Sequence, residues 1–162
     1  MKLPSWPRIP FARITALTLA ASALAITPGC ASRKDSARFE PASAIRISAL
    51  SGSDLRLNHL VVDGKPVETA DYPITLRFAD GGKISGRSAV NRYFGSFELN
   101  KEGEIIWPKG GLGMTRMAGP APAMDLESQF SKALTATTRL MTSPDSARFE
   151  SSDGKQALEF KR

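Results

Sequence analysis

Few side chains in this sequence are suited to chemistry. The chain contains one cysteine, Cys30, and one histidine, His59, with no second cysteine or acidic cluster spaced to complete a metal site around the histidine. A serine nucleophile would have only His59 as its base, and no nucleophile-elbow motif accompanies it. We therefore expect no catalytic residue, no metal and no cofactor. We expect His59 to be a surface or half-buried strand residue.

Cys30 lies where a bacterial lipoprotein signal would end. Residues 1–13 carry three basic side chains and no acidic one, and an apolar run follows over residues 14–26. This run is shorter than the roughly 20 apolar residues that span a bilayer. A small residue, Gly29, directly precedes the cysteine, as in lipoprotein signals. The sequence therefore predicts a removed signal peptide over residues 1–29 and a lipid on Cys30.

A lipid on Cys30 would fix the location of the protein. Several acyl chains give stable membrane attachment. The next residues are Ala31 and Ser32, with no aspartate, and by similarity to proteobacterial sorting we expect the periplasmic face of the outer membrane. The alternative is an ordinary secretory signal cleaved near Ala31, because Thr27 and Pro28 fit the outer lipobox positions poorly.

The rest of the chain has the size and charge of one small domain. The net charge of the whole chain is +6, and removing the three basic residues of the signal leaves 19 Lys and Arg against 16 Asp and Glu, or +3. These basic residues are scattered along the sequence, so we expect no nucleic-acid partner. Residues 30–43 are predicted to be a lipidated tether rich in Ser, Ala, Arg and Pro. Residues 44–162 are predicted to form one monomeric domain without a disulfide.

Most of this domain shows the apolar alternation that is typical of strands. The segments with this pattern are residues 45–47, 55–62, 74–78, 97–99, 104–107, 147–150 and 157–160, and a further strand opens at Ile84. Turn signals rich in Gly, Asp, Asn and Ser separate several of them. The pattern predicts an antiparallel meander.

One helix is predicted to interrupt the strands. Asp125 can cap its N-terminus, and Glu127 favours the positive end of the helix dipole. Apolar residues then recur along one helical stripe. The stripe consists of Leu126, Phe130, Ala133, Leu134, Thr137 and Met141. We expect this helix to pack on the open face of the sheet and to end before Pro144.

Four motifs occur in an order that resembles a known family. They are ITLRFADGGKISG (74–86), NRYFGSF (91–97), MTRMA (114–118) and MDLE (124–127). Together they resemble the META domain of HslJ-type bacterial lipoproteins, over residues 45–160. The resemblance implies an α+β fold that is mainly antiparallel β, a meander or partly open β-barrel with one helix packed against it. It also implies residence in the periplasm or envelope, a link to stress response and no accepted enzymatic activity.

The chain departs from the family pattern where relatives commonly carry two cysteines. Val90 stands before the Asn-Arg-Tyr-Phe-Gly motif, and Gly119 follows the Thr-Arg-Met-Ala motif. If the two family positions lie close together, this protein has replaced the cysteine pair with packing, and no redox role carries over. A third departure is Leu55 or Leu57, where the family usually has Trp in the first strand pair.

The second and third motifs are the best candidates for a binding surface. Arginine offers a planar donor fork, and Tyr and Phe carry large apolar area. The candidate residues are Asn91, Arg92, Tyr93, Phe94, Arg116 and Met117. The alternative is a role in folding. Asn91 and Gly95 would then form turns, one of the two aromatic residues would lie in the core, and Arg116 would pair with a carboxylate.

Two classes of function remain open. The first is a non-enzymatic, lipid-anchored envelope protein that acts in the envelope stress response or supports an outer-membrane or periplasmic protein partner. The second is a periplasmic carrier or sensor of a small apolar ligand held between sheet and helix. An empty core around Phe130 and Leu134 would favour the carrier, and an exposed apolar edge strand would favour the partner-binding protein.

The hexapeptide DSARFE occurs twice, at residues 35–40 and 145–150. The first copy falls in the predicted tether and the second in a late strand. The repeat is either coincidental, because no longer similarity surrounds it, or allows the tether copy to replace the later copy at the sheet edge.

Overall fold

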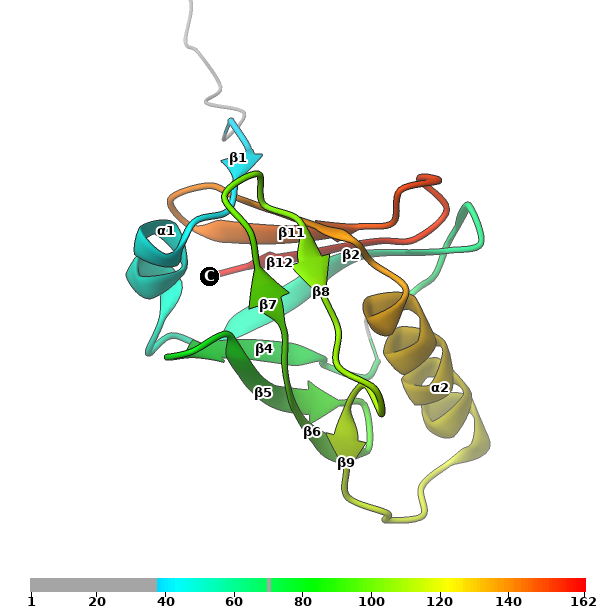
Figure 1. The fold of residues 1–162 in the computed structure, drawn as a ribbon. Helices are drawn as coiled ribbons and strands as arrows, with labels where there is room; N and C mark the ends of the chain where they lie inside the picture. Colours follow the sequence, from blue (N-terminus) through cyan, green and yellow to red (C-terminus); the bar gives the residue numbers. More distant parts are fainter. Residues whose placement is uncertain (1–37, 70) are drawn as a thin grey trace, which may run out of the picture. The chain divides into compact units, whose positions relative to one another are not determined.

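An antiparallel sheet forms most of the domain (Figure 1). The computed structural model describes residues 38–69 and 71–162, so the predicted signal peptide over residues 1–29 and the predicted lipid site at Cys30 lie outside the described residues. The helices are α1 (Ala44–Leu50) and α2 (Ala121–Thr135). The strands are β1 (Glu40–Pro41), β2 (Leu55–Val62), β3 (Lys65–Pro66), β4 (Thr75–Ala79), β5 (Lys83–Ser88), β6 (Asn91–Ser96), β7 (Glu98–Leu99), β8 (Ile105–Ile106), β9 (Gly113–Met114), β10 (Arg139–Thr142), β11 (Ser146–Glu150) and β12 (Ala157–Lys161).

The main sheet is not closed, and a separate hairpin connects two of its distant parts. The strand order is β1-β10-β11-β12-β2-β4-β5-β6-β9, with β3 paired to β2. The β7–β8 hairpin extends from the β4–β5 turn to the segment before β10. Phe97 N donates to Gly82 O at 3.0 Å, and Ile105 N donates to Thr138 O at 2.9 Å. The predicted α+β fold, an incompletely closed antiparallel sheet with a helix packed against it, is therefore confirmed.

Most of the predicted strands are confirmed. The alternating segments at residues 55–62, 74–78, 97–99, 104–107, 147–150 and 157–160 correspond to β2, β4, β7, β8, β11 and β12, and Ile84 lies in β5. Strand β2 turns into β3 at Asp63 and Gly64, whose φ angles are 51° and 76°, the left-handed backbone that two-residue hairpin turns use. His59 is exposed on β2, as predicted.

The strand predicted at residues 45–47 is wrong, because this segment belongs to helix α1. The Ser43 side chain accepts a hydrogen bond from Arg46 N at 3.4 Å and caps the helix. Ile47 and Leu50 are buried one turn apart, whereas Ile45 is 82% exposed. Alternation between only two isoleucines cannot distinguish a strand from a short helix whose buried residues recur every three positions.

Helix α2 lies closer to the N-terminus of the chain than the sequence predicts. It begins at Ala121 after Pro120, without a side-chain cap, so Asp125 lies within the helix rather than at its start. It ends at Thr135, and Met141 belongs to β10. The apolar spacing from 134 to 141 fits a helix, but pairing with β11 holds residues 139–142 in extended form. Long-range sheet pairing has overridden the local pattern here.

Aromatic rings fill the space between α2 and the sheet. The Phe149 ring lies 6.3 Å from the rings of Phe78 and Phe97 and 6.1 Å from that of Phe160. The Phe160 ring lies 6.5 Å from that of Phe130 on α2. All five side chains are buried. Phe149 therefore links strands β11 and β12 to strand β4 across the core. The centre of the core is closely packed.

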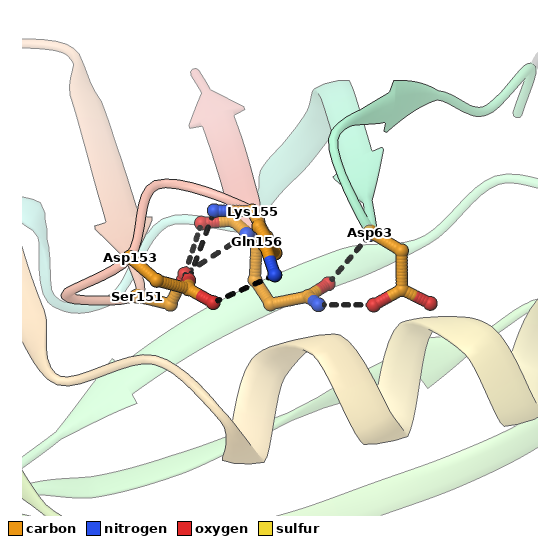
Figure 2. Close-up of polar contacts among 5 residues, drawn as sticks. All are labelled: Asp63, Ser151, Asp153, Lys155 and Gln156. Carbon is orange, nitrogen blue, oxygen red and sulfur yellow. Dashed lines mark hydrogen bonds and ion pairs between the residues drawn. The ribbon is translucent and has the colours of Figure 1, made fainter.

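The tips of two hairpins are joined by side-chain hydrogen bonds (Figure 2). Gln156 Nε2 donates to Asp63 Oδ1 at 2.9 Å, and Gln156 Oε1 accepts from Asp63 N at 3.3 Å. Within the β11–β12 turn, Asp153 accepts from Ser151 Oγ at 2.5 Å and from Lys155 N at 3.0 Å. These bonds extend the β2–β12 pairing beyond the end of the ladder.

The described end of the first hexapeptide copy and most of the second copy flank the same strand. Glu40, the last residue of the first copy, pairs with Thr142 of β10, and β11, which holds residues 146–150 of the second copy, pairs along the other side of β10. The Arg148 guanidinium of the second copy lies 5.9 Å from the centre of the Phe39 ring of the first. Among the described residues, β1 is an edge strand of two residues that includes Pro41, and such edges resist further strand addition.

Truncating the ring at the centre of the core should destabilise the domain strongly. We expect Phe149→Ala to lower the free energy of unfolding by about 3–5 kcal/mol, because it removes a buried ring and leaves a cavity among its neighbours. Urea unfolding followed by tryptophan fluorescence measures the change. Ile106→Ala, at a side chain that is 63% exposed, is the control and should stay within about 0.5 kcal/mol of the parent chain. Equal stabilities of the two variants would contradict the assignment of Phe149 to the core.

Candidate functional site

A buried carboxylate on α2 joins the helix to the β5–β6 hairpin. Glu127 Oε2 accepts from Ser88 Oγ at 3.0 Å and from Asn91 N at 2.7 Å, and Glu127 Oε1 accepts from Asn91 Nδ2 at 2.8 Å. The hairpin turns at Ala89, whose φ of 58° directs Asn91 back toward the helix. No ion pair involves Glu127 among residues 38–69 and 71–162. Hydrogen bonds alone therefore stabilise this carboxylate in the interior.

The Asn91 side chain uses its full hydrogen-bonding capacity. Besides Glu127, its Nδ2 donates to Met117 O at 3.2 Å, and its Oδ1 accepts from Met117 N and Thr115 Oγ1, each at 2.8 Å. The Thr115 backbone N also donates to Arg92 O at 3.0 Å. Asn91 therefore acts like a strand partner for Met117, and it fixes the segment after β9 against β6 and α2.

The structure divides the six predicted surface residues into two sets. Arg92, Phe94, Arg116 and Met117 are exposed, whereas Asn91 and Tyr93 are buried. The Tyr93 hydroxyl donates to Thr75 O at 2.7 Å, and burial raises the pKa of Tyr93 well above its ordinary value. Because residues of a strand alternate between its faces, Asn91 and Tyr93 lie beneath the surface that the other residues form.

The alternative folding roles are only partly observed. Tyr93 lies in the core, as that alternative expected, but Asn91 and Gly95 lie in strand β6 instead of forming turns. The Asn91 side chain contacts segments far away in the sequence. Arg116 forms no ion pair within the described part of the chain.

Two open hollows adjoin the exposed ring of Phe94, which is 59% exposed. One hollow, of about 740 Å³, is bordered by polar side chains, among them Thr115 and Arg116, and by a group of apolar ones. We call the apolar group the methionine patch, and its members are Leu112, Met114, Met117 and Met124. The other hollow, of about 820 Å³, has Arg77, Arg87 and Arg92 in its lining, together with Asp54 and apolar side chains. Exposed residues of the two family motifs therefore lie between the methionine patch and a group of arginines.

The role of Glu127 differs from the one predicted from the sequence, a favourable interaction with the helix dipole. Glu127 lies one position after Leu126 and three before Phe130, on the buried face of α2. A carboxylate inside an apolar stripe is the signal that could have found it. The group of arginines was also not predicted, because its members are separated in the sequence and meet only through strand register.

The described residues contain neither a metal-binding cluster nor a membrane-spanning helix. No group of three or more His, Cys, Asp and Glu side chains there could hold a metal ion. No helix in residues 38–69 or 71–162 is long and apolar enough to cross a membrane.

The antiparallel sheet and the helix packed against it form a small α+β domain. The family model of the META domain matches residues 48–162, and the chain therefore belongs to the META domain family. No curated protein matches the chain.

Solved structures have a similar fold. An NMR structure of a protein from Burkholderia xenovorans is 27% identical, with a TM-score of 0.56 over 90% of this chain and 98% of that chain. A second NMR structure is 28% identical, with a TM-score of 0.50 over 71% and 92% of the two chains. A crystal structure of a DUF4847 family protein from Bacteroides vulgatus, 10% identical, has a TM-score of 0.50 over 69% and 93%. This last likeness concerns the fold alone.

Positions 90 and 119, at which the family resemblance implies a pair of cysteines, are neighbours in the structure. A Cβ atom added to Gly119 would lie 2.6 Å from Val90 Cγ2 and 3.4 Å from Val90 Cβ. The Val90 side chain therefore occupies the space that a side chain at position 119 would need. This supports the expectation that packing replaces the cysteine pair here.

Restoring both cysteines should create a disulfide. In a Cys30→Ser background, we expect Val90→Cys with Gly119→Cys to oxidise readily, because the Cβ separation is close to the range of disulfides. The bond should raise the free energy of unfolding by about 3 kcal/mol. Intact mass and urea unfolding with and without reductant provide the measurement. Either single cysteine variant is the control, and a double variant that remains reduced under oxidising conditions would show that the two positions are not adjacent.

Replacing the amide of Asn91 by a carboxylate should destabilise the domain in a pH-dependent way. We expect Asn91→Asp to cost at least about 2 kcal/mol near neutral pH, because two carboxylates would then share one buried site. Their repulsion would raise a folded-state pKa above its unfolded value of about 4, so the loss should shrink as the pH falls through that raised pKa. Urea unfolding at several pH values tests this. Asn58→Asp, at an exposed position of β2, is the matched control, and a similar small effect at both positions would contradict the role of Asn91.

Proposed function

We propose that this protein is a non-enzymatic, lipid-anchored envelope protein whose META domain supports a protein partner at the periplasmic face of the outer membrane, in the envelope stress response or in assembly there. The observation that carries the anchoring is the position of Cys30, directly after a basic segment, an apolar run and Gly29. The partner-binding role rests on the surface around the second and third family motifs.

The methionine patch supports binding of a protein partner. Met117 is 58% exposed, and Met124 stands beside it at the start of α2. Methionine side chains are flexible and polarizable, and they suit surfaces that adapt to a partner. The backbone beneath the patch is held in place, because both the N–H and the C=O of Met117 bond to Asn91. An ordered backbone under adaptable side chains reduces the entropy cost of binding.

Addition of a partner strand to the sheet is not favoured at either end. Strand β1 is two residues long and includes Pro41. Strand β9 lies next to α2, where Ser131 Oγ is 3.7 Å from Met114 Sδ. Short or covered edges do not template further strands. We therefore assign the partner to the methionine patch, not to the exposed edge strand considered from the sequence.

The packing of the core favours a partner-binding protein over a carrier of an apolar ligand. Phe130 and Leu134 of α2 are fully buried, and the Tyr93 and Phe130 rings lie 5.2 Å apart. A carrier would need an apolar cavity between these elements. The polar groups of Asn91 and Glu127 bond to one another and to Ser88, Thr115 and Met117, which supports a structural role over a catalytic one.

Lipidation of Cys30 is the first property to test. We expect the chain from a bacterial membrane fraction to have an intact mass that corresponds to residues 30–162 with acyl chains on Cys30. Cys30→Ser should abolish the acylated mass, whereas Ser32→Ala, the matched control, should retain it. An unmodified N-terminus at or after Ala31 in the parent chain would contradict the anchor.

Native mass spectrometry tests the partner-binding domain against the carrier. We expect residues 31–162, purified from a periplasmic extract, to have the mass of the protein alone. A stoichiometric apolar adduct that is released on mild denaturation would favour the carrier and would overturn the proposed role.

A further inference from the structure

Four arginines from four adjacent strands lie on the outward face of the sheet. In the β2–β4 ladder Arg56 is opposite Thr75, and in the β5–β6 ladder Arg87 is directly opposite Arg92. Arg77 of β4 is opposite Ser85 on the same outward side. We call this surface the arginine face, and it consists of Arg56, Arg77, Arg87 and Arg92. All four are exposed.

Only one of these arginines has a carboxylate partner among the described residues. Arg77 donates from Nε and Nη2 to the two oxygens of Asp54, both at 2.9 Å, and this contact raises the pKa of Arg77. No ion pair within residues 38–69 and 71–162 involves Arg56, Arg87 or Arg92. Four arginines and one aspartate give the arginine face a formal charge of +3.

The pair formed by Arg87 and Arg92 is unfavourable in the isolated domain. Like charges on directly opposed residues of neighbouring strands destabilise a sheet. Within residues 38–69 and 71–162, the Arg87 side chain makes one weak hydrogen bond, from Nε to Ala89 O at 3.4 Å, and its other donors bond to none of these residues. An anion placed between the two guanidinium groups would remove the repulsion and accept paired hydrogen bonds.

An exposed aromatic ring adjoins these charges. Phe94 is opposite Ser85, in the row next to Arg87 and Arg92, and it lines the same hollow of about 820 Å³. Its ring also covers Gly113 of β9, where a side chain would collide with it. The ring is therefore supported from one side and open on the other. A partner of the arginine face would meet both cationic and apolar groups.

We propose that the arginine face binds the anionic surface of a phospholipid membrane, with the arginines at the headgroup phosphates and Phe94 in the interfacial layer. From β2 to β6 the charges extend over three strand spacings, or about 14 Å. That width suits an array of phosphates better than a single anionic group. The exposed ring of Phe94 beside these charges suits the interfacial layer of a bilayer, where apolar groups lie next to the headgroups.

This inference extends the proposed function, because a lipid on Cys30 would hold the arginine face close to a bilayer. Its own residues do not include Cys30, so it can be tested without the lipid. The META family model matches residues 48–162. A chain of residues 31–162 therefore contains all of the region that this model matches.

Vesicle co-sedimentation of residues 31–162 tests the arginine face. We expect binding to vesicles of phosphatidylcholine with about 30% phosphatidylglycerol and little binding to phosphatidylcholine alone, and the binding should weaken as salt is added. Arg87→Gln with Arg92→Gln should weaken binding about 30-fold, at roughly fivefold for each arginine. Phe94→Ser should weaken it further while the salt dependence stays the same.

The control removes the same charge elsewhere. Lys101→Gln with Arg139→Gln changes the β7–β8 turn and β10, and it should leave vesicle binding within about twofold of the parent chain. Equal losses of vesicle binding in the two double variants, or no loss in either, would contradict membrane binding by the arginine face. The chain could also fail to bind the vesicles but bind polyglutamate in a way that depends on these arginines. That result would contradict membrane binding and would identify an acidic protein segment as the ligand of the arginine face. Because this chain lacks Cys30, neither result affects the mass measurement of the anchor.

Discussion

Glu127 places a carboxylate in the interior of the domain, where a charged group without partners would cost several kcal/mol. Three hydrogen bonds from Ser88 and Asn91 offset this cost. The same bonds constrain three segments at once. They fix the rotation of α2, the direction of the β5–β6 turn and, through the Asn91 amide, the segment after β9. Because each partner would be left unsatisfied if another moved, the arrangement specifies one geometry.

The exposed surface depends on this buried arrangement. In β6, residues with opposite roles alternate along the strand: Asn91 and Tyr93 face inward, whereas Arg92 and Phe94 face outward. Asn91 holds β6 against α2, and the Tyr93 hydroxyl holds it against β4. The pairing register of β6 with β5 decides which charges meet on the outside, including the opposition of Arg87 and Arg92. A family motif can therefore be needed for folding and still determine the chemistry of the surface above it.

Several parts of this structure could be predicted from the sequence. Alternation and turn residues identified β2, β4, β11 and β12, because each strand has one buried face and ends at a residue suited to a tight turn. Helix α1 could not be predicted from two isoleucines, and the end of α2 could not be predicted because the pairing of β10 with β11 overrides the helical spacing. The position of Glu127 inside an apolar stripe indicates a buried carboxylate, but its partners could not be identified without the segment opposite α2. The arginine face required the register of four strands, which residues distant in the sequence establish together.

The pairing of β1 with β10 shortens the connection between the domain and its predicted anchor. Glu40 is part of the sheet and Ser43 caps α1, so ten residue steps separate Cys30 from the first described strand. Ten residue steps reach at most about 35 Å. If a lipid anchors Cys30, a connection of this length would keep the domain at a high effective concentration near the bilayer. Contacts too weak to recruit a free protein would then be sufficient to set which face of the domain turns toward the lipid.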